Sequence, residues 1–170
     1  MDLRPACPAD APALAELGQR SFTVKFGHLY RPEDLHAFLS DSHSEAKVAK
    51  EIADPQMRIM LAEDDGRLLG YCKLVMVCGW PEHARGSRVI ELKQLYTDPE
   101  VTGRGIGARL MDWAMDEARG FAADEIQLSV WSENLGAQKF YARYRFEKVA
   151  DIHFMVGEQR DEEFLFARMV

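Results

Sequence analysis

Residues 91–108, ELKQLYTDPEVTGRGIGA, pass from an apolar strand pattern through a glycine-rich turn into a helix pattern. The glycines let the backbone approach an anion closely, and the first N–H groups of the helix then face that anion. The guanidinium of Arg104 can add a charge-assisted contact. The stretch therefore predicts a phosphate-binding turn made of Thr102, Gly103, Arg104, Gly105, Ile106, Gly107 and Ala108.

Other phosphate-binding patterns and a ligand-free turn compete with this interpretation. The Walker pattern fails because no Lys-Ser or Lys-Thr pair follows the last glycine. The dinucleotide fingerprint fits in its relaxed form, Gly103-x-Gly105-x-x-Ala108, with Glu133 as the ribose-binding acid. That fold expects further parallel strands, whereas the remaining residues end in an antiparallel pattern. A glycine turn without a ligand stays open as an alternative.

Hydrophobic spacing and turn residues place this turn within an α/β order of elements. Helices are expected from Asp10, its N-cap, from residue 31, and over 44–53, 106–119 and 135–144. Strands are expected over 3–6, 58–63, 68–78, 88–97, 126–131, 149–156 and 164–169, with a tight turn at 64–66 and a loop over 79–87. A hairpin thus precedes a βαβα unit, and no repeat or linker divides the chain.

Length and composition fit one domain over residues 1–170. The chain is 47% apolar and 29% charged, and a chain of this length buries roughly 70% of the surface that its unfolded form exposes. No apolar run approaches the ~20 residues that cross a bilayer. The first five residues lack the apolar core of a signal peptide. We therefore expect a cytoplasmic protein without a membrane partner.

Charge and ligand spacing argue against two further classes of protein. The net charge is −7, whereas a nucleic-acid binder needs clustered Lys and Arg; the acidic balance mildly suits a cationic substrate. Cys7, Cys72 and Cys78 show no C-x-x-C spacing, and the five histidines show no zinc-type pairing. Free thiols and no metal site are expected.

Two motifs in the second half of the chain resemble those of the GNAT superfamily of N-acetyltransferases. Residues 91–107 resemble its motif A, whose core is Gln/Arg-x-x-Gly-x-Gly/Ala at a helix start, and residues 130–146 resemble its motif B, a strand, an Asn and an A-x-x-F-Y helix. Ser21-Phe22, residues 154–157 and residues 161–169 further resemble bacterial polyamine (spermidine/spermine) acetyltransferases of the PaiA type.

The resemblance implies the GNAT fold and its co-substrate. That fold is α/β (α+β), a central mixed, mostly antiparallel sheet of six to seven strands flanked by helices and splayed at the fourth and fifth strands. The implied co-substrate is acetyl-CoA, with no metal. Two positions depart from the family pattern. Thr102 replaces a Gln or Arg that grips pyrophosphate, and Arg145 replaces a glycine whose left-handed conformation costs a bulky residue roughly 1 kcal/mol.

Acetyl transfer to an amine requires a neutral amine and a proton for the departing thiolate. Glu91 lies where some GNAT enzymes carry a catalytic base, acting through water, although a plain surface pair with Lys93 is the alternative. Tyr141 corresponds to the tyrosine that in many members protonates the sulfur, and packing beside Phe140 is its alternative.

The resemblance also assigns binding roles. Main-chain groups of Leu95, Tyr96 and Thr97 would face the acetyl and pantetheine portion, and Asn134 would bond the pantetheine arm or cap the following helix. The acceptor is expected at the loop 80–85 and the first two helices, where the polar candidates are Tyr30, Glu33, Asp34 and Glu82.

The sequence thus predicts an N-acetyltransferase that acts by direct attack in a ternary complex. A polyamine is the favoured small-molecule amine, and a peptide or protein amino group and an aminoglycoside are the alternatives. A protein that binds acetyl-CoA as a sensor, without turnover, is a hypothesis from a different class. No nucleic-acid partner is expected, and a homodimer is compatible with the sequence.

Overall fold

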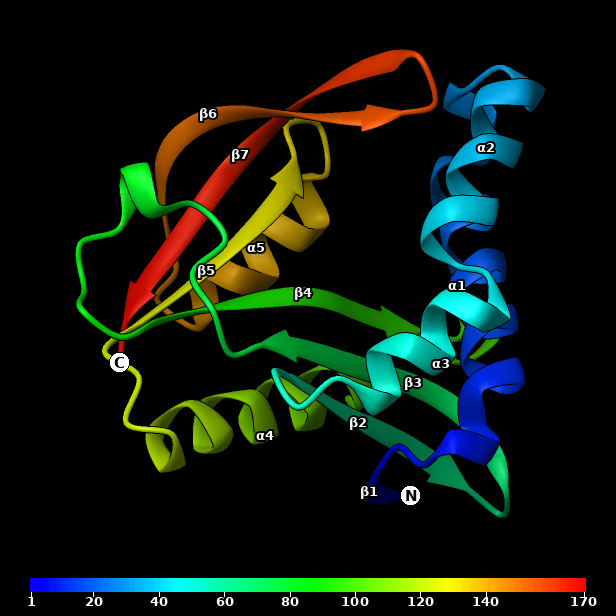
Figure 1. The fold of residues 1–170 in the computed structure, drawn as a ribbon, viewed down its shortest axis with the longest axis horizontal. Helices are drawn as coiled ribbons and strands as arrows, with labels where there is room; N and C mark the ends of the chain where they lie inside the picture. Colours follow the sequence, from blue (N-terminus) through cyan, green and yellow to red (C-terminus); the bar gives the residue numbers. More distant parts are fainter.

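Seven strands form one sheet in the order β1-β2-β3-β4-β5-β7-β6 in the computed structural model, which describes residues 1–170 (Figure 1). The strands are β1 (Asp2–Pro5), β2 (Met57–Asp64), β3 (Arg67–Val75), β4 (Val89–Thr97), β5 (Glu125–Trp131), β6 (Glu147–Val156) and β7 (Gln159–Met169). β4 and β5 are parallel, and the other neighbouring pairs are antiparallel. This confirms the mixed, mostly antiparallel sheet. A single parallel pair does not build the doubly wound sheet of a dinucleotide-binding fold.

Five α-helices cover the two faces of this sheet. They are α1 (Ala11–Phe26), α2 (Pro32–Ser42), α3 (Glu45–Ala53), α4 (Ile106–Gly120) and α5 (Leu135–Arg143). α1 and α3 pack with Leu61 and Tyr71 on one face. α4 and α5 pack on the other face, so the sheet has distinct helical layers on its two sides. No helix combines the length and the apolar character that crossing a bilayer requires.

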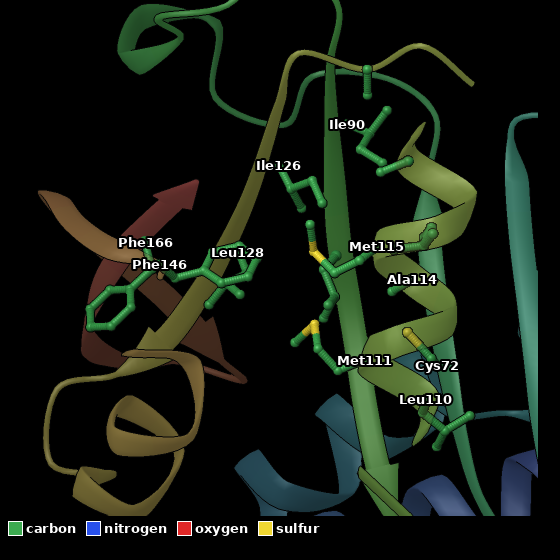
Figure 2. Packing of buried hydrophobic residues seen from close by; sticks show 14 of the residues in the cluster. Cys72, Ile90, Leu110, Met111, Ala114, Met115, Ile126, Leu128, Phe146 and Phe166 are labelled. Atoms are coloured by element: carbon green, nitrogen blue, oxygen red, sulfur yellow. The ribbon is translucent and has the colours of Figure 1, made fainter. Parts of the chain in front are cut away.

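α4 presents apolar residues at helical spacing to the centre of the sheet. Its buried side meets β4 and β5 through Leu110, Met111, Ala114, Met115, Ile90 and Ile126 (Figure 2). Fully burying a side chain of the leucine or methionine class stabilises a fold by roughly 1.5–3 kcal/mol. This packing therefore fixes the helix whose first turn carries the glycines.

β4 and β5 diverge after a short paired segment. They pair only at Val89↔Glu125, Ile90↔Ile126 and Glu91↔Gln127, although β4 continues to Thr97 and β5 to Trp131. The pairing of β3 with β4 skips Lys93, which is the extra residue of a β-bulge. A bulge bends its strand and increases the local twist, and this bend carries β4 away from β5. The expected splay is confirmed.

The loop between β3 and β4 is held on the start of β5 by buried side chains. The Gln127 side chain accepts from the Trp80 N–H at 3.1 Å and donates to the Trp80 carbonyl at 3.0 Å. The Glu125 carboxylate, which is fully buried, accepts from the N–H groups of Arg85 and Gly86. The loop therefore has a fixed position beside the splay.

One strand start differs from the expectation, and one helix cap lacks its expected bond. β7 begins at Gln159 and not at residue 164, because its first residues are mostly polar and give no apolar signal. Asp10 is the N-cap residue of α1, as expected, but its side chain makes no cap bond to the helix. Its carboxylate instead accepts from the Cys7 N–H at 2.7 Å and from the Arg4 guanidinium.

Candidate active site

A cavity of about 450 Å³ lies at the splay of β4 and β5. Residues 91–96 of β4 and residues 129–131 of β5 line it, together with side chains from α1, α2, α5, β6 and β7. The unpaired parts of β4 and β5 thus form its walls, and it reaches helices on both faces of the sheet.

The strand register assigns the lining residues to two sides of the sheet. Ladder partners point to the same face, so Leu95 shares the face of Cys72, where α4 packs, and Tyr96 shares the face of Tyr71, where α1 and α3 pack. We name these the α5 side and the α1 side of the cavity. The α5 side is lined by Leu92, Leu95, Val130, Asn134, Ala137 and Tyr141, and the α1 side by Phe22, Phe26, Tyr30, Glu91, Tyr96, Trp131 and Glu163.

The glycine turn leads into α4 with its amide groups free. Gly103 and Gly105 have φ values of 80° and 75°, which only glycine adopts readily, and Gly105 is the N-cap of α4. The first amide with a protein partner after the turn belongs to Arg109, whose N–H donates to the Gly105 carbonyl at 3.1 Å. Ile106 is buried, whereas Thr102 and Arg104 are exposed. The helix N-terminus therefore offers the unpaired N–H groups of Gly105, Ile106, Gly107 and Ala108 to an anion.

The segment before this turn is anchored by a buried carboxylate. The Asp98 carboxylate accepts from the Glu100 N–H at 3.0 Å. It also accepts from the guanidinium groups of Arg20, at 2.8 and 3.3 Å, and of Arg67, at 2.8 Å. Burial alone would raise the pKa of Asp98, but these donors outweigh it and lower the pKa to about 2. Asp98 therefore ties the turn to α1 and β3.

Arg104 does not point at an anion site in this structure. Its guanidinium lies 3.6 Å from the Asp64 carboxylate at the end of β2. Thr102 closes the short 3-10 turn Pro99–Val101 as its C-cap residue. The backbone amides, and not these two side chains, are therefore the preorganised part of the turn.

Main-chain groups of β4 face the cavity in alternation. The Asp98 N–H donates to the Leu69 carbonyl of β3 at 2.8 Å. In an antiparallel ladder the residues alternate, so Tyr96 turns its N–H and carbonyl to β3, and Leu95 and Thr97 turn theirs to the open edge. The Thr97 carbonyl accepts from Ser21 Oγ at 3.1 Å. Leu95 therefore offers free backbone groups to the cavity, and Tyr96 contributes its side chain to the lining.

α5 supplies Asn134 and Tyr141 to the cavity. The Asn134 Oδ1 accepts from the Ala137 N–H at 3.1 Å, so Asn134 is the N-cap and its amide NH₂ stays available. The Tyr141 ring packs with Phe140 and Phe146 at centroid distances of 5.5 and 6.0 Å. Burial raises the pKa of Tyr141, which keeps its hydroxyl protonated at neutral pH.

Arg145 ends α5 in the left-handed conformation that the sequence predicts, with φ 63°. The Arg145 N–H donates to the Ala142 carbonyl and the Phe146 N–H to the Tyr141 carbonyl, at 2.9 and 3.1 Å. These two bonds define a Schellman motif. The motif places Phe146 in the core beside Tyr141.

Glu91 lies at the closed end of the splay, on the α1 side. A Cβ atom placed on Gly79 would be 3.0 Å from Glu91 Oε2, so the loop backbone covers this carboxylate. Burial raises the pKa of Glu91, and the charge of Lys93 opposes this shift only in part. Both residues line the cavity, and the Lys93 bulge removes the simple surface pair considered from the sequence.

The polar candidates expected for the acceptor are only partly brought together. Tyr30 lines the cavity, and its hydroxyl donates to the Asp161 carboxylate of β7. Asp34 instead accepts from the Glu158 N–H and from Arg31, which fastens the β6–β7 turn to α2. Glu33 and Glu82 are exposed and lie outside the lining.

Sequence reasoning missed two carboxylates of the cavity, Asp41 of α2 and Glu163 of β7. Glu163 of β7 lines the α1 side, where burial and the neighbouring Asp161 raise its pKa to about 7. The available signal was the alternation of Asp161 and Glu163 at strand spacing, which extends β7 towards the cavity.

The sheet is splayed at β4 and β5 over a cavity, and the glycine turn presents free amide groups at the start of α4. The model of the acetyltransferase (GNAT) family matches residues 13–146, and the chain belongs to this family. It is therefore an acyltransferase that uses acetyl-CoA as co-substrate.

Relatives and solved structures agree with this assignment. An uncharacterized N-acetyltransferase of Mycobacterium bovis is 31% identical over 94% of this chain and 97% of the relative. Another, of Lactobacillus delbrueckii, is 28% identical over 94% of this chain and 91% of the relative. The fold matches that of a PaiA N-acetyltransferase from Thermoplasma acidophilum, solved with coenzyme A, with a TM-score of 0.81 and 21% identity over 99% of this chain and 98% of that chain.

Proposed function

We propose that the protein transfers the acetyl group of acetyl-CoA to a primary amine of a small aliphatic polyamine by direct attack in a ternary complex. The two-sided cavity carries this proposal. Leu95, Ala137 and Tyr141 of its α5 side pack against the core cluster of the helix that begins with the glycine turn. Its α1 side opens among aromatic and acidic side chains. A thioester and an amine can thus meet in the gap between β4 and β5.

The α5 side has the groups that a coenzyme arm requires. Free N–H groups at the start of α4 suit the diphosphate, and Leu95 and Asn134 offer hydrogen-bonding groups along the gap. The protonated Tyr141 hydroxyl faces the same space and has no protein partner. In this proposal it gives its proton to the departing sulfur.

The α1 side has the features that recognise an aliphatic cation. Aromatic faces attract ammonium groups by roughly 0.5–2 kcal/mol each, and the lining contains Phe22, Phe26, Tyr30, Phe38, Trp80, Trp131 and Phe154. Carboxylates of Asp41, Glu91 and Glu163 add negative charge. Lys25 also lines the cavity, and burial lowers its pKa. The structural likeness to a PaiA enzyme adds support for a polyamine acceptor.

A non-catalytic acetyl-CoA sensor would not require a proton donor and carboxylates in one cavity. Tyr141 lines the α5 side, and the carboxylates of Glu91 and Glu163 line the α1 side of the same cavity, which favours turnover. We also propose a cytoplasmic location, because all three cysteines are free thiols and free thiols persist in reducing compartments.

Release of free thiol from acetyl-CoA tests the proposal. We expect the highest kcat/KM with spermidine or spermine, lower values with aminoglycosides and peptides, and one acetyl group per thiol in the product by mass spectrometry. Preference for a peptide or an aminoglycoside would overturn the acceptor class. Acetyl-CoA binding without thiol release across the panel would favour the sensor.

A further inference from the structure

Glu163 occupies a distinct place in the acceptor part of the cavity. It pairs with Trp131 of β5 and with Ile152 of β6 in the ladders of β7, and it shares the α1 side with Trp131. Neither partner carries a charge. No ion pair or hydrogen bond neutralises the Glu163 carboxylate within the protein, although most of its surface is withdrawn from water.

The polar groups around Glu163 come from several elements. Asp161 of its own strand repels it, and the phenols of Tyr30, before α2, and Tyr96, on β4, lie within range of its charge. The cation that α1 contributes to the cavity lining is Lys25, whose pKa is itself lowered by burial. The other charged groups that line the cavity are Asp41, Lys47, Glu91 and Lys93. Nothing in this set provides Glu163 with a dedicated cationic partner.

The position of Glu163 differs from that of Glu91 along the gap. Glu91 pairs with Gln127, where the strands still touch, whereas Glu163 is level with Trp131, four residues further along β5. At about 3.3 Å per residue the two levels are roughly 13 Å apart. Leu95 lies four residues beyond Glu91 on β4, and the bulge takes up one of these residues. The remaining three residues place the free backbone groups of Leu95 roughly 10 Å beyond Glu91. Along the gap, Glu163 is therefore closer than Glu91 to the level of the free backbone groups of Leu95.

We propose that the Glu163 carboxylate binds the acceptor ammonium group and takes the proton that frees its nitrogen for attack. The inference rests on the proposed function and names the catalytic base of that same site. Glu91 is then a charged wall at the closed end of the cavity.

The proton balance of the step is complete with groups of this chain and solvent. Glu163 takes one proton from the ammonium nitrogen, and the freed lone pair forms the N–C bond to the thioester carbonyl carbon. The C–S bond breaks, and the Tyr141 hydroxyl gives its proton to the sulfur. The nitrogen loses its second proton, through solvent, as the amide forms, and Tyr141 is reprotonated. Glu163 then releases its proton, so one proton per turnover reaches solvent.

The base assignment predicts the sign of the pH dependence. A carboxylate base must be ionised, and the pKa of Glu163 is raised to about 7, so kcat/KM falls as the pH drops below 7. General-base catalysis contributes roughly 100- to 10,000-fold. We therefore expect Glu163→Gln to lower kcat at pH 8 by at least about 100-fold and to abolish the inflection near pH 7.

Two variants complete the experiment. Glu162→Gln is the matched control, since the exposed Glu162 side chain lies outside the cavity and forms an ion pair with Arg160, and it should keep the wild-type profile. Glu91→Gln should keep the inflection near pH 7. Acetyl-CoA affinity and melting temperature, measured for each variant, show that the fold and donor site are intact.

Three outcomes separate this inference from the proposed function. Loss of kcat and of the inflection in Glu163→Gln alone supports Glu163 as the base. If Glu163→Gln keeps the wild-type kcat, or if Glu91→Gln instead loses the inflection of kcat/KM near pH 7, Glu163 is not the base. The proposed function is unaffected by either result. A wild-type protein that acetylates no amine overturns both.

Discussion

Replacing Tyr141 with phenylalanine removes one hydroxyl group from the α5 side of the cavity and leaves the ring in place. The ring contacts with Phe140 and Phe146 depend on aromatic packing, which phenylalanine keeps. The hydroxyl has no protein partner, so its removal leaves no buried donor or acceptor unpaired. We expect a change of less than about 0.5 kcal/mol in the free energy of unfolding.

The effect on turnover should be much larger. Burial holds the pKa of Tyr141 above its usual range, so the hydroxyl remains a proton donor throughout the neutral pH range. A positioned general acid contributes roughly 100- to 10,000-fold to rate, or about 2.7–5.4 kcal/mol of barrier. The prediction for Tyr141→Phe is a loss of kcat within that range, with the dissociation constant for acetyl-CoA within about threefold of wild type.

Thiol-release kinetics with spermidine, calorimetry with acetyl-CoA and thermal unfolding measure the three quantities. Tyr144→Phe is the matched control on the same helix. Its hydroxyl donates to the Ala108 carbonyl or to Asp112, at 3.1 Å in each case, and lies outside the cavity. This variant should lose about 1 kcal/mol of stability and keep its kcat. Unchanged turnover in Tyr141→Phe would reduce Tyr141 to a packing residue and refute the general-acid role.

Three further substitutions test the turns and the anchor of the glycine segment. Arg145→Gly should raise the free energy of unfolding, measured in urea, by about 1 kcal/mol, because glycine adopts φ 63° without steric conflict. The control Ala142→Gly, inside α5, should lower the free energy of unfolding. A loss of stability in Arg145→Gly would show that Arg145 is not strained. Gly105→Ala should weaken acetyl-CoA binding, measured by calorimetry, about tenfold. A Cβ atom there would meet no atom within 4 Å, but alanine is strained at the φ of 75° that Gly105 adopts. Gly66→Ala is the control, because it has the same φ strain in the β2–β3 turn and should keep the affinity. Asp98→Asn should lower the melting temperature at pH 7, and the difference from wild type should shrink as the pH falls from 4 to 2. The pKa of Asp98 in the folded state, about 2, lies below the ordinary 3.8, so the ionised carboxylate stabilises the fold fully above pH 4 and loses this effect as it is protonated. An equal loss of melting temperature at pH 7 and pH 2 would contradict a role for the charge.

The elements that follow strict patterns could be predicted from the sequence. The α4 face repeats at helical spacing, and the glycines before it have few uses other than positive φ at a helix start. The left-handed residue at the end of α5 was expected at Arg145 even though arginine disfavours that conformation. In these places local chemistry and tertiary packing require the same structure.

The acceptor side could not be predicted in the same way. Its lining comes from α1, α2, β6 and β7, which meet only after the sheet has formed, and no spacing in the sequence records that meeting. Asp34 was a reasonable candidate by composition, yet its carboxylate is occupied by Arg31 and by the Glu158 N–H. Glu163 lies in a polar stretch that gives no apolar signal for a strand, so the sequence predicts a strand that starts only at residue 164 and leaves Glu163 outside it.

Lys93 shows how one residue connects these two sides. No glycine, proline or charge cluster marks position 93 as a bulge, and strict alternation from Glu91 would place Lys93 and Leu95 on the α1 side. The bulge shifts the alternation by one, which sends Leu95 to the α5 side and Tyr96 to the α1 side. It also bends β4 away from β5, so that the backbone groups of Leu95 lose a strand partner and face the cavity. The local irregularity therefore opens the gap and, at the same residue, decides which side chains each half of the cavity receives. Any substitution or deletion that restores regular pairing between β4 and β5 would close the space in which thioester and amine meet.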